Sequence, residues 1–436
     1  MIHVVSVDRV QWPLFIPVYA VYFSFKAMQE PPRHTKHARD AMTRSIAMGL
    51  PLLVVLVLAA AVRVRSRKRT GSSAAAAAAA TPPRVPFELD YKGVDAAPGI
   101  LRVIALLLPD FALDSHVITQ IQGGITNLLW KVSGPSGSVL VRVYGENTEL
   151  MFDRQQECAL FGELAARGFG PKLLGLFANG RIEGYFEASR NLEHYEMGQT
   201  APVDFPSLIA HELARMHAIT DMPVLKTPRI WTVLDQWLAQ ASAVSFPEDA
   251  AKQALLRSFD LAGFARELEW LKTLLPSPAN GHGKPWSDRG RGTALAIEPV
   301  FCHNDALSGN VLYLPRERRC QLIDFEYGGY NYRAFDVANH FCEYAGFDFD
   351  LARFYPTSPM RRRFLVAYCA SSNIAPLSAA ELAALEQLTN RFALCAHAMW
   401  FLWAVLQARH SVIPVDFIDY ARKRREGFFA HKKEFC

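Results

Sequence analysis

The chain of 436 residues has few charged side chains, few cysteines and no evident internal repeat. Charged residues make up 20% of it and hydrophobic residues 50%, which excludes global disorder and allows a large buried core. The formal net charge is only +5, and the five basic residues of RVRSRKR (63–69) match that excess. The rest of the chain is close to neutral and lacks the broad basic face that nucleic-acid binding requires.

The seven cysteines are spread from Cys158 to Cys436 and form no CxxC pair. An odd number at irregular spacing argues against a disulfide framework and against a zinc site. We therefore expect reduced thiols, as in a cytosolic protein.

The first 95 residues differ in composition from the rest. Residues 46–62 form an apolar run of about 17 residues, the lower limit for a helix that crosses a bilayer. One prediction is a membrane anchor, with the basic cluster 63–69 and the globular part on the cytosolic side. A signal-peptide core is a weaker alternative, and another is a translated leader that a start at Met42 or Met48 would shorten.

An Ala-rich linker (71–83) leads to the globular part, in which strand patterns precede helical ones. Strands are predicted within 117–134, 138–145 and 173–188, helices at 98–108 and 153–167, and mainly helices from 205 onward. This order predicts an α+β fold with two lobes. The predicted divisions are an extension (1–95), a small antiparallel-sheet lobe (96–188) and a large, mainly helical lobe (189–436).

The most informative segment is FCHNDALSGNVLYLPRERRCQLIDFEYGG (301–329). Two short apolar strands flank a polar turn, and pairing them as a hairpin brings Asn310 opposite Asp324. Asp305 lies on the preceding loop, and Glu326 follows Asp324 by two residues. Such oxygen ligands suit Mg²⁺, and a separate carboxylate beside the metal can accept a proton from a hydroxyl group.

The spacing H-x-D-x-x-x-x-N followed by I-D-F is typical of the catalytic and metal-binding loops of kinases. On this interpretation Asp305 is the catalytic base, Asn310 and Asp324 hold Mg²⁺, and His303 supports the loop. An ordinary hairpin with an Asx turn is the structural alternative, but it rarely has this spacing.

The sequence resembles the choline/ethanolamine kinases, and it looks most like the ethanolamine kinases. The resemblance covers about 100–432 and is strongest in IDFEYGGYNYRAFDVANHFCEYAGFD (323–348). Further matching segments are GGITN (123–127), VLVRVYG (139–145), ECALF (157–161), GPKLLGLFANGRIE (170–183) and FALCAHAMWFLWAVLQA (392–408). The resemblance implies a bilobal, protein-kinase-like fold that binds ATP in its smaller lobe.

The resemblance also implies which residues contact ATP. The phosphate loop would contribute Gly123, Gly124, Thr126 and Asn127, the strand cation and its helix partner would be Arg142 and Glu157, and the adenine hinge would be Glu183, Gly184 and Tyr185. Glycines permit close approach to phosphates, and an arginine fork can hold a carboxylate and a phosphate oxygen together. Glu326 is a further candidate metal ligand, next to Asn310 and Asp324.

An aminoalcohol acceptor requires an acidic and partly aromatic pocket. Together with Asp305, the resemblance assigns Tyr327, Glu343, Trp400 and Trp403 to this pocket. The two tryptophans are three residues apart and share one helix face, although an all-apolar helix is also typical of a protein core. Asp348 and Asp350 either add acceptors for a primary ammonium group or are solvated loop charges.

The implied activity is ATP-dependent phosphorylation of ethanolamine, the first step of phosphatidylethanolamine synthesis by the CDP-ethanolamine route. A choline kinase or a dual choline/ethanolamine kinase is the alternative, because Ser308-Gly309 is nearer to the choline branch. An antibiotic phosphotransferase of the same fold and a membrane-tethered pseudokinase scaffold fit less well. The expected location is the cytoplasm, with or without a membrane anchor, and a homodimer is left open.

Overall fold

The structure is a computed structural model, and it describes residues 82–90, 96–121, 127–144, 154–277, 286–411 and 415–436. These residues belong to one compact unit of the chain. The apolar run 46–62 lies outside the described residues, as does most of the Ala-rich linker. The predicted anchor therefore stays a prediction.

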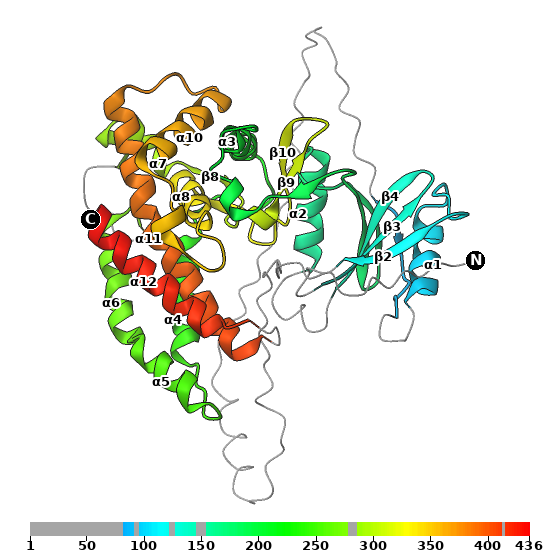
Figure 1. Cartoon of the computed structure of the whole chain (residues 1–436), viewed down its shortest axis with the longest axis horizontal. Coiled ribbons are helices and arrows are strands. Elements are labelled where there is room, and N and C mark those ends of the chain that lie inside the picture. Colours follow the sequence, from blue (N-terminus) through cyan, green and yellow to red (C-terminus); the bar gives the residue numbers. More distant parts are fainter. Residues whose placement is uncertain (1–81, 91–95, 122–126, 145–153, 278–285, 412–414) are drawn as a thin grey trace, which may run out of the picture. The chain divides into compact units, whose positions relative to one another are not determined.

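The N-terminal lobe is built on one six-stranded sheet with the order β1-β5-β6-β4-β3-β2. All neighbouring strands are antiparallel except β1 and β5. Figure 1 shows β2, β3 and β4 side by side, next to α1. The elements are β1 (Arg84–Val85), α1 (Ala97–Leu107), β2 (Val117–Ile121), β3 (Asn127–Gly134), β4 (Gly137–Tyr144), α2 (Arg154–Ala166), β5 (Leu173–Phe177) and β6 (Gly180–Gly184).

Strand β4 shows how the sequence pattern orients this sheet. Its side chains alternate, so that Val139, Val141 and Val143 are buried in one hydrophobic cluster together with residues of α1. Because successive side chains on a strand point to opposite faces, Leu140 and Arg142 face the other way. Both line a large cavity, described below. The apolar alternation of β4 thus directs Arg142 toward the site.

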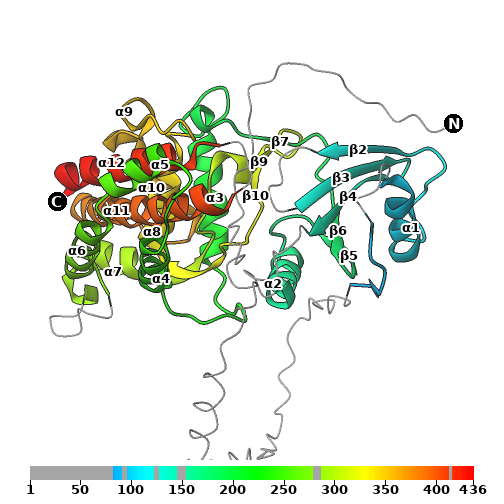
Figure 2. The same ribbon diagram turned by 90° about the horizontal axis from the view of Figure 1, so that it is seen from below.

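The C-terminal lobe is mainly helical (Figure 2). Its helices are α3 (Phe205–His217), α4 (Ile230–Ser242), α5 (Ala250–Ser258), α6 (Leu261–Leu274), α7 (Arg291–Ile297), α8 (Arg333–Glu343), α9 (Leu351–Phe354), α10 (Ser358–Ser371), α11 (Ala379–His410) and α12 (Phe417–Phe435). Short strands complete it: β7 (Arg190–Asn191), β8 (Pro299–Cys302), β9 (Val311–Leu314), β10 (Arg319–Leu322) and β11 (Gly329–Tyr332). Among the described residues of this lobe, 3₁₀ turns lie at His194–Glu196, Trp286–Arg289 and Ser308–Asn310.

Helix α11 is the central helix of this lobe. Ser378 and Glu381 form a capping box that fixes its start, and it packs against α4, α7, α8 and α12. Within the described residues it is the one helix that is long and apolar enough to cross a membrane, and 89% of its most apolar stretch is buried inside the protein. Such burial is typical of a core helix in a globular protein.

Helix α2 and the turn after it bring the sheet next to the C-terminal lobe. Leu164 and Phe169 belong to the large hydrophobic cluster of that lobe, together with Phe325. Gly170 has a positive φ of 67°, and a Cβ atom there would lie 2.8 Å from the Phe325 ring. Glycine is therefore required where the chain passes the loop that carries Asp324.

Candidate active site

The predicted hairpin is present and positions the first group of site residues. Strands β9 and β10 are antiparallel, with Val311 opposite Leu322. The Ile323 N–H donates to the Asn310 carbonyl at 3.0 Å, which holds the two loops side by side. Asn310 Nδ2 donates to Asp305 Oδ2, also at 3.0 Å. The sequence spacing therefore brings Asp305, Asn310 and the start of the Asp324 loop together.

Asp305 is buried, with 1% of its surface exposed. Its Oδ1 atom has no hydrogen-bond partner among the described residues. Burial raises the pKa of Asp305 well above its usual value, and the nearby carboxylates Glu343, Asp324 and Glu326 raise it further. Carboxylates that repel one another in this way are stabilised by a cation, and oxygen ligands of this kind fit Mg²⁺.

Asp336 on α8 anchors the loop that carries Asp305 by hydrogen bonds to its backbone. Its Oδ2 accepts from the backbone N–H of His303 at 2.9 Å, and its Oδ1 accepts from the N–H of Asn304 at 2.6 Å. His217 Nε2 donates to the same carboxylate at 2.9 Å. Burial alone would raise the pKa of Asp336, but these contacts hold the pKa below its usual value. Asp336 therefore stays ionised and anchors the loop.

His303 contributes to the loop with both ring nitrogens. Nδ1 accepts from the Asp305 N–H at 3.2 Å, and Nε2 donates to the Ile323 carbonyl at 3.0 Å. Burial lowers the pKa of His303, which favours the neutral ring that this pattern requires. The ring thus bridges the Asp305 loop and the residue before Asp324.

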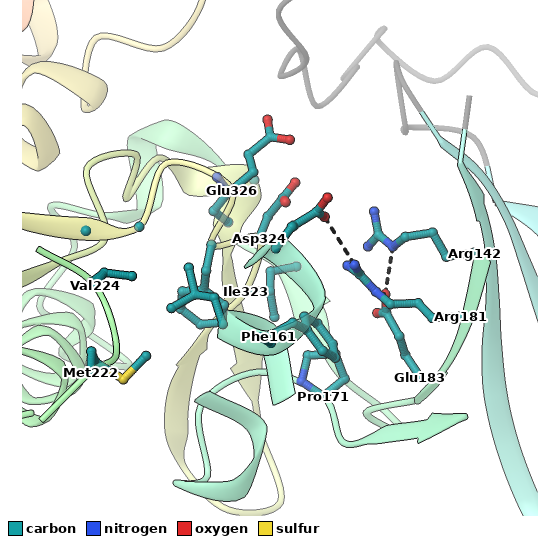
Figure 3. A pocket seen from close by; sticks show the side chains of 18 of the residues that line it. Arg142, Phe161, Pro171, Arg181, Glu183, Met222, Val224, Ile323, Asp324 and Glu326 are labelled. Atoms are coloured by element: carbon teal, nitrogen blue, oxygen red, sulfur yellow. Dashed lines mark hydrogen bonds and ion pairs between the residues drawn. The ribbon is translucent and has the colours of Figure 1, made fainter. Parts of the chain in front are cut away.

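The sheet contributes a buried chain of alternating charges (Figure 3). Arg142 Nε and Arg181 Nε both donate to Glu183 Oε1 at 2.7 Å, and Arg181 Nη1 bonds Glu157 at 3.1 Å. Burial alone would raise the pKa of Glu183, but the two arginines hold the pKa below its usual value. Arg142 and Glu157, expected to be partners, are thus linked through Arg181 and Glu183.

A cavity of about 1390 Å³ lies between the sheet and the loop that carries Asp324. In Figure 3, Arg142 and Arg181 lie on one side, Met222 and Val224 on the other, and Asp324 between them. The predicted residues that line the cavity are Arg142, Glu157, Glu183, Gly184, Tyr185, Asn310, Asp324 and Glu326. Those that do not are Asp305, Tyr327, Glu343, Trp400 and Trp403. Gly123, Gly124 and Thr126 lie outside the described residues, and Asn127 begins β3.

The hinge candidates are only partly available to a ligand. The Glu183 side chain is buried in its ion pairs, and the Gly184 N–H already donates to the Lys172 carbonyl at 2.8 Å. Tyr185 lines the cavity, with the Lys131 ammonium 4.1 Å from its ring centroid.

The predicted acceptor residues form a closed aromatic cluster. Trp400 packs edge-on against Tyr327 and against Trp403, with centroid separations of 5.4 and 5.5 Å. Trp400 Nε1 donates to the Asn339 side chain at 2.7 Å. Both tryptophans are at most 2% exposed, so in this conformation they are core residues that lie beside the site.

Glu343 lies near Asp305 and has a cationic partner of its own. Arg424 Nη1, from α12, donates to Glu343 Oε1 at 3.0 Å, and both side chains are buried. Burial raises the pKa of Glu343, although Arg424 opposes the rise. The predicted acidic contact is therefore paired with an arginine that the sequence did not single out.

Residues 118–429 match the family described as choline/ethanolamine kinase. A probable ethanolamine kinase of Arabidopsis thaliana is 36% identical over 309 residues, which cover 70% of this chain and 76% of that protein. The chain belongs to the choline/ethanolamine kinase family.

Other members of the family are similar over comparable lengths. Ethanolamine kinase 2 of Mus musculus is 34% identical, over 81% of this chain and 86% of its own. Choline kinase alpha of Mus musculus is 31% identical, over 74% of this chain and 76% of its own. The solved structure of a Plasmodium vivax ethanolamine kinase has a TM-score of 0.62 at 24% identity, and it covers 78% of this chain and 89% of that one. The predicted family and fold class are confirmed.

Three residues of this kinase site were missed by sequence reasoning. Arg181 had a readable signal, because the R-x-E pattern in β6 puts Arg181 and Glu183 on one strand face. Asp336 and Arg424 had none, because Asn304 and Glu343, the site residues that they bond, lie 32 and 81 residues away in sequence.

Proposed function

We propose that the protein transfers the γ-phosphoryl group of ATP to the hydroxyl group of ethanolamine. The observation that carries this proposal is the buried Asp305 carboxylate, which is bonded to Asn310, a residue that lines a large cavity together with Asp324. Family membership supports it, since relatives called ethanolamine kinase are 32–36% identical to this chain.

Asp305 acts as the base of this reaction. Its Oδ2 is oriented by Asn310, which leaves Oδ1 to accept the hydroxyl proton as the ethanolamine oxygen attacks phosphorus. Asn310, Asp324 and Glu326 would hold Mg²⁺, which would supply positive charge to neutralise the phosphates. Arg142 and Arg181, fixed by Glu183, face the nucleotide phosphates from the sheet side.

The acceptor is a small aminoalcohol, and we infer ethanolamine. Glu343 and Tyr327 attract and enclose the ammonium group, and Trp400 and Trp403 form the wall behind them. Choline is the second candidate, because aromatic faces suit a quaternary ammonium group and choline kinases are also among the relatives. Asp350 accepts from the Arg353 N–H at the start of α9, which gives it a structural role instead.

Steady-state kinetics with a coupled ADP assay test the substrate assignment. We expect a higher kcat/KM for ethanolamine than for choline, and the reverse order would make the protein a choline kinase. Replacing Asp305 with Ala should lower kcat by about 10²-fold or more, while the thermal shift with Mg-ATP is retained. Near-normal turnover of this variant would contradict the base assignment, and a wild-type protein without any thermal shift would favour a scaffold.

We further propose a cytoplasmic location with an anchor at 46–62. Carbonate extraction of the full-length chain tests the anchor: recovery in the pellet supports it, and recovery in the supernatant excludes it. Self-association into a homodimer is tested by sedimentation of the same preparation.

A further inference from the structure

Arg229 lines the same cavity as the sheet residues Arg142 and Arg181. It immediately precedes α4 and ends the segment 222–229, all of which lines the cavity. Its backbone N–H donates to the Tyr330 carbonyl at 3.2 Å. Its side chain packs against Gly329, at the start of β11. A Cβ atom added to Gly329 would lie 3.3 Å from Arg229 Cδ and Nη1. Arg229 is thus fixed between α4 and the residues that follow Asp324.

The charge of Arg229 has no protein counter-ion in the described part of the chain. Arg142 and Arg181 share Glu183, and Arg181 also has Glu157, whereas no ion pair or hydrogen bond joins the Arg229 guanidinium to a carboxylate. Burial lowers the pKa of Arg229, so the surrounding protein does penalise its charge. Its surface is nevertheless exposed, and it lines the cavity. An exposed arginine that lines a cavity and has no carboxylate partner is available to bind an anionic ligand.

The position of Arg229 also disfavours a purely structural role. It is the N-cap residue of α4 and makes no side-chain cap hydrogen bond. A cation at the positive end of the helix dipole is unfavourable, and Ser, Thr, Asp or Asn would be the stabilising choice. A residue that breaks a local rule in this way beside a site is expected to serve function.

We propose that Arg229 binds the phosphate of the phosphomonoester product on the acceptor side of the cavity. This inference rests on the proposed function. In that reaction the ethanolamine oxygen forms a bond to the γ-phosphorus, the bond from this phosphorus to the ADP oxygen breaks, and Asp305 takes the hydroxyl proton. The transferred group moves away from Arg142 and Arg181 and toward Arg229, whose planar fork matches phosphate oxygens.

Equilibrium binding to the full chain tests this assignment, with phosphoethanolamine, ethanolamine and Mg-ADP as separate probes. Arg229→Met should weaken phosphoethanolamine binding by about 10- to 100-fold, the loss expected for charge-assisted hydrogen bonds. It should change the Kd values of ethanolamine and Mg-ADP less than about twofold. Arg229→Lys should recover part of the loss, because the charge is kept and the fork is lost. Arg316→Met, at the exposed β9–β10 turn, is the matched control with the same charge change.

Two results would overturn the inference: unchanged phosphoethanolamine binding, or an equal loss for phosphoethanolamine and ethanolamine, which would indicate a structural role. Failure of the proposed function looks different, since wild-type protein would then fail to phosphorylate ethanolamine. If wild-type protein prefers choline, the same comparison is made with phosphocholine and choline. In that case Arg229→Met should weaken the binding of phosphocholine but not the binding of choline. An equal loss of binding for both ligands would refute the inference.

Discussion

Replacing Asp336 with Asn tests whether this buried carboxylate, which bonds the backbone just before Asp305, holds Asp305 in place. Asp336 accepts from two backbone N–H groups with different oxygens, Oδ2 from His303 and Oδ1 from Asn304. An asparagine has one acceptor oxygen, so its NH₂ group must face one of these donors. No rotation of the amide avoids this conflict.

The magnitude follows from these contacts. One buried N–H left without an acceptor costs about 1–3 kcal/mol, and the remaining hydrogen bonds lose the additional strength that an ionised acceptor provides. We expect Asp336→Asn to lower the free energy of unfolding by about 3–4 kcal/mol. Because the loop carries Asp305, the proposed base, kcat should fall by about 10²-fold, while KM for ATP changes little.

Urea unfolding and steady-state kinetics measure these two effects on the same preparation. Asp110→Asn is the control, since Asp110 is exposed in the turn after α1 and the change in charge is identical. Wild-type stability and kcat in Asp336→Asn would refute the anchoring role. A loss of stability with unchanged kcat would show that Asp336 supports the fold without positioning the base.

Three further outcomes are expected. The pKa of Glu183 lies below its usual value, so its contribution to stability is present at pH 7 and is lost as pH falls below about 4.5. The difference in melting temperature between wild type and Glu183→Gln should therefore shrink as pH falls over that range. Arg424→Met leaves Glu343 buried without its partner and should lower the free energy of unfolding by about 3–5 kcal/mol in urea, with Arg316→Met unchanged. EDTA should abolish turnover and added Mg²⁺ restore it, with Asp324→Asn requiring a higher Mg²⁺ concentration; full activity in EDTA would exclude the metal.

The sequence was sufficient where contacts are local or follow a strand period. The hairpin of 301–329 was predictable because two apolar segments flank one polar turn, and β9 and β10 do pair as expected. The alternation of VLVRVYG likewise gives Arg142 the face opposite to the buried valines. In both cases the side-chain direction follows from the neighbouring residues alone.

The partners of these residues were harder to predict because they depend on strand register. Arg142 lies directly opposite Arg181 in the pairing of β4 with β6. Two like charges at this position repel, and Glu183 relieves the repulsion by accepting from both. Arg142 and Glu157 are therefore linked through a chain of four residues. The R-x-E spacing of β6 indicates that Arg181 and Glu183 share a face, but the register that places Arg142 opposite Arg181 is not readable from the sequence.

The acceptor region shows why a resemblance assigns residues more readily than their environment. Glu343 and Trp400 are near Asp305 or its loop, but each has a partner within the protein. Arg424 neutralises the Glu343 carboxylate, and the Asn339 side chain accepts a hydrogen bond from Trp400. A free acidic pocket would have attracted any small cation, whereas a carboxylate already paired with a buried guanidinium keeps only its second oxygen for a ligand. Under the proposed function, selectivity for an aminoalcohol depends on how Arg424 orients Glu343. Glu343 ends α8 and Arg424 lies on α12, so their pairing depends on packing between helices far apart in sequence, which no single motif encodes.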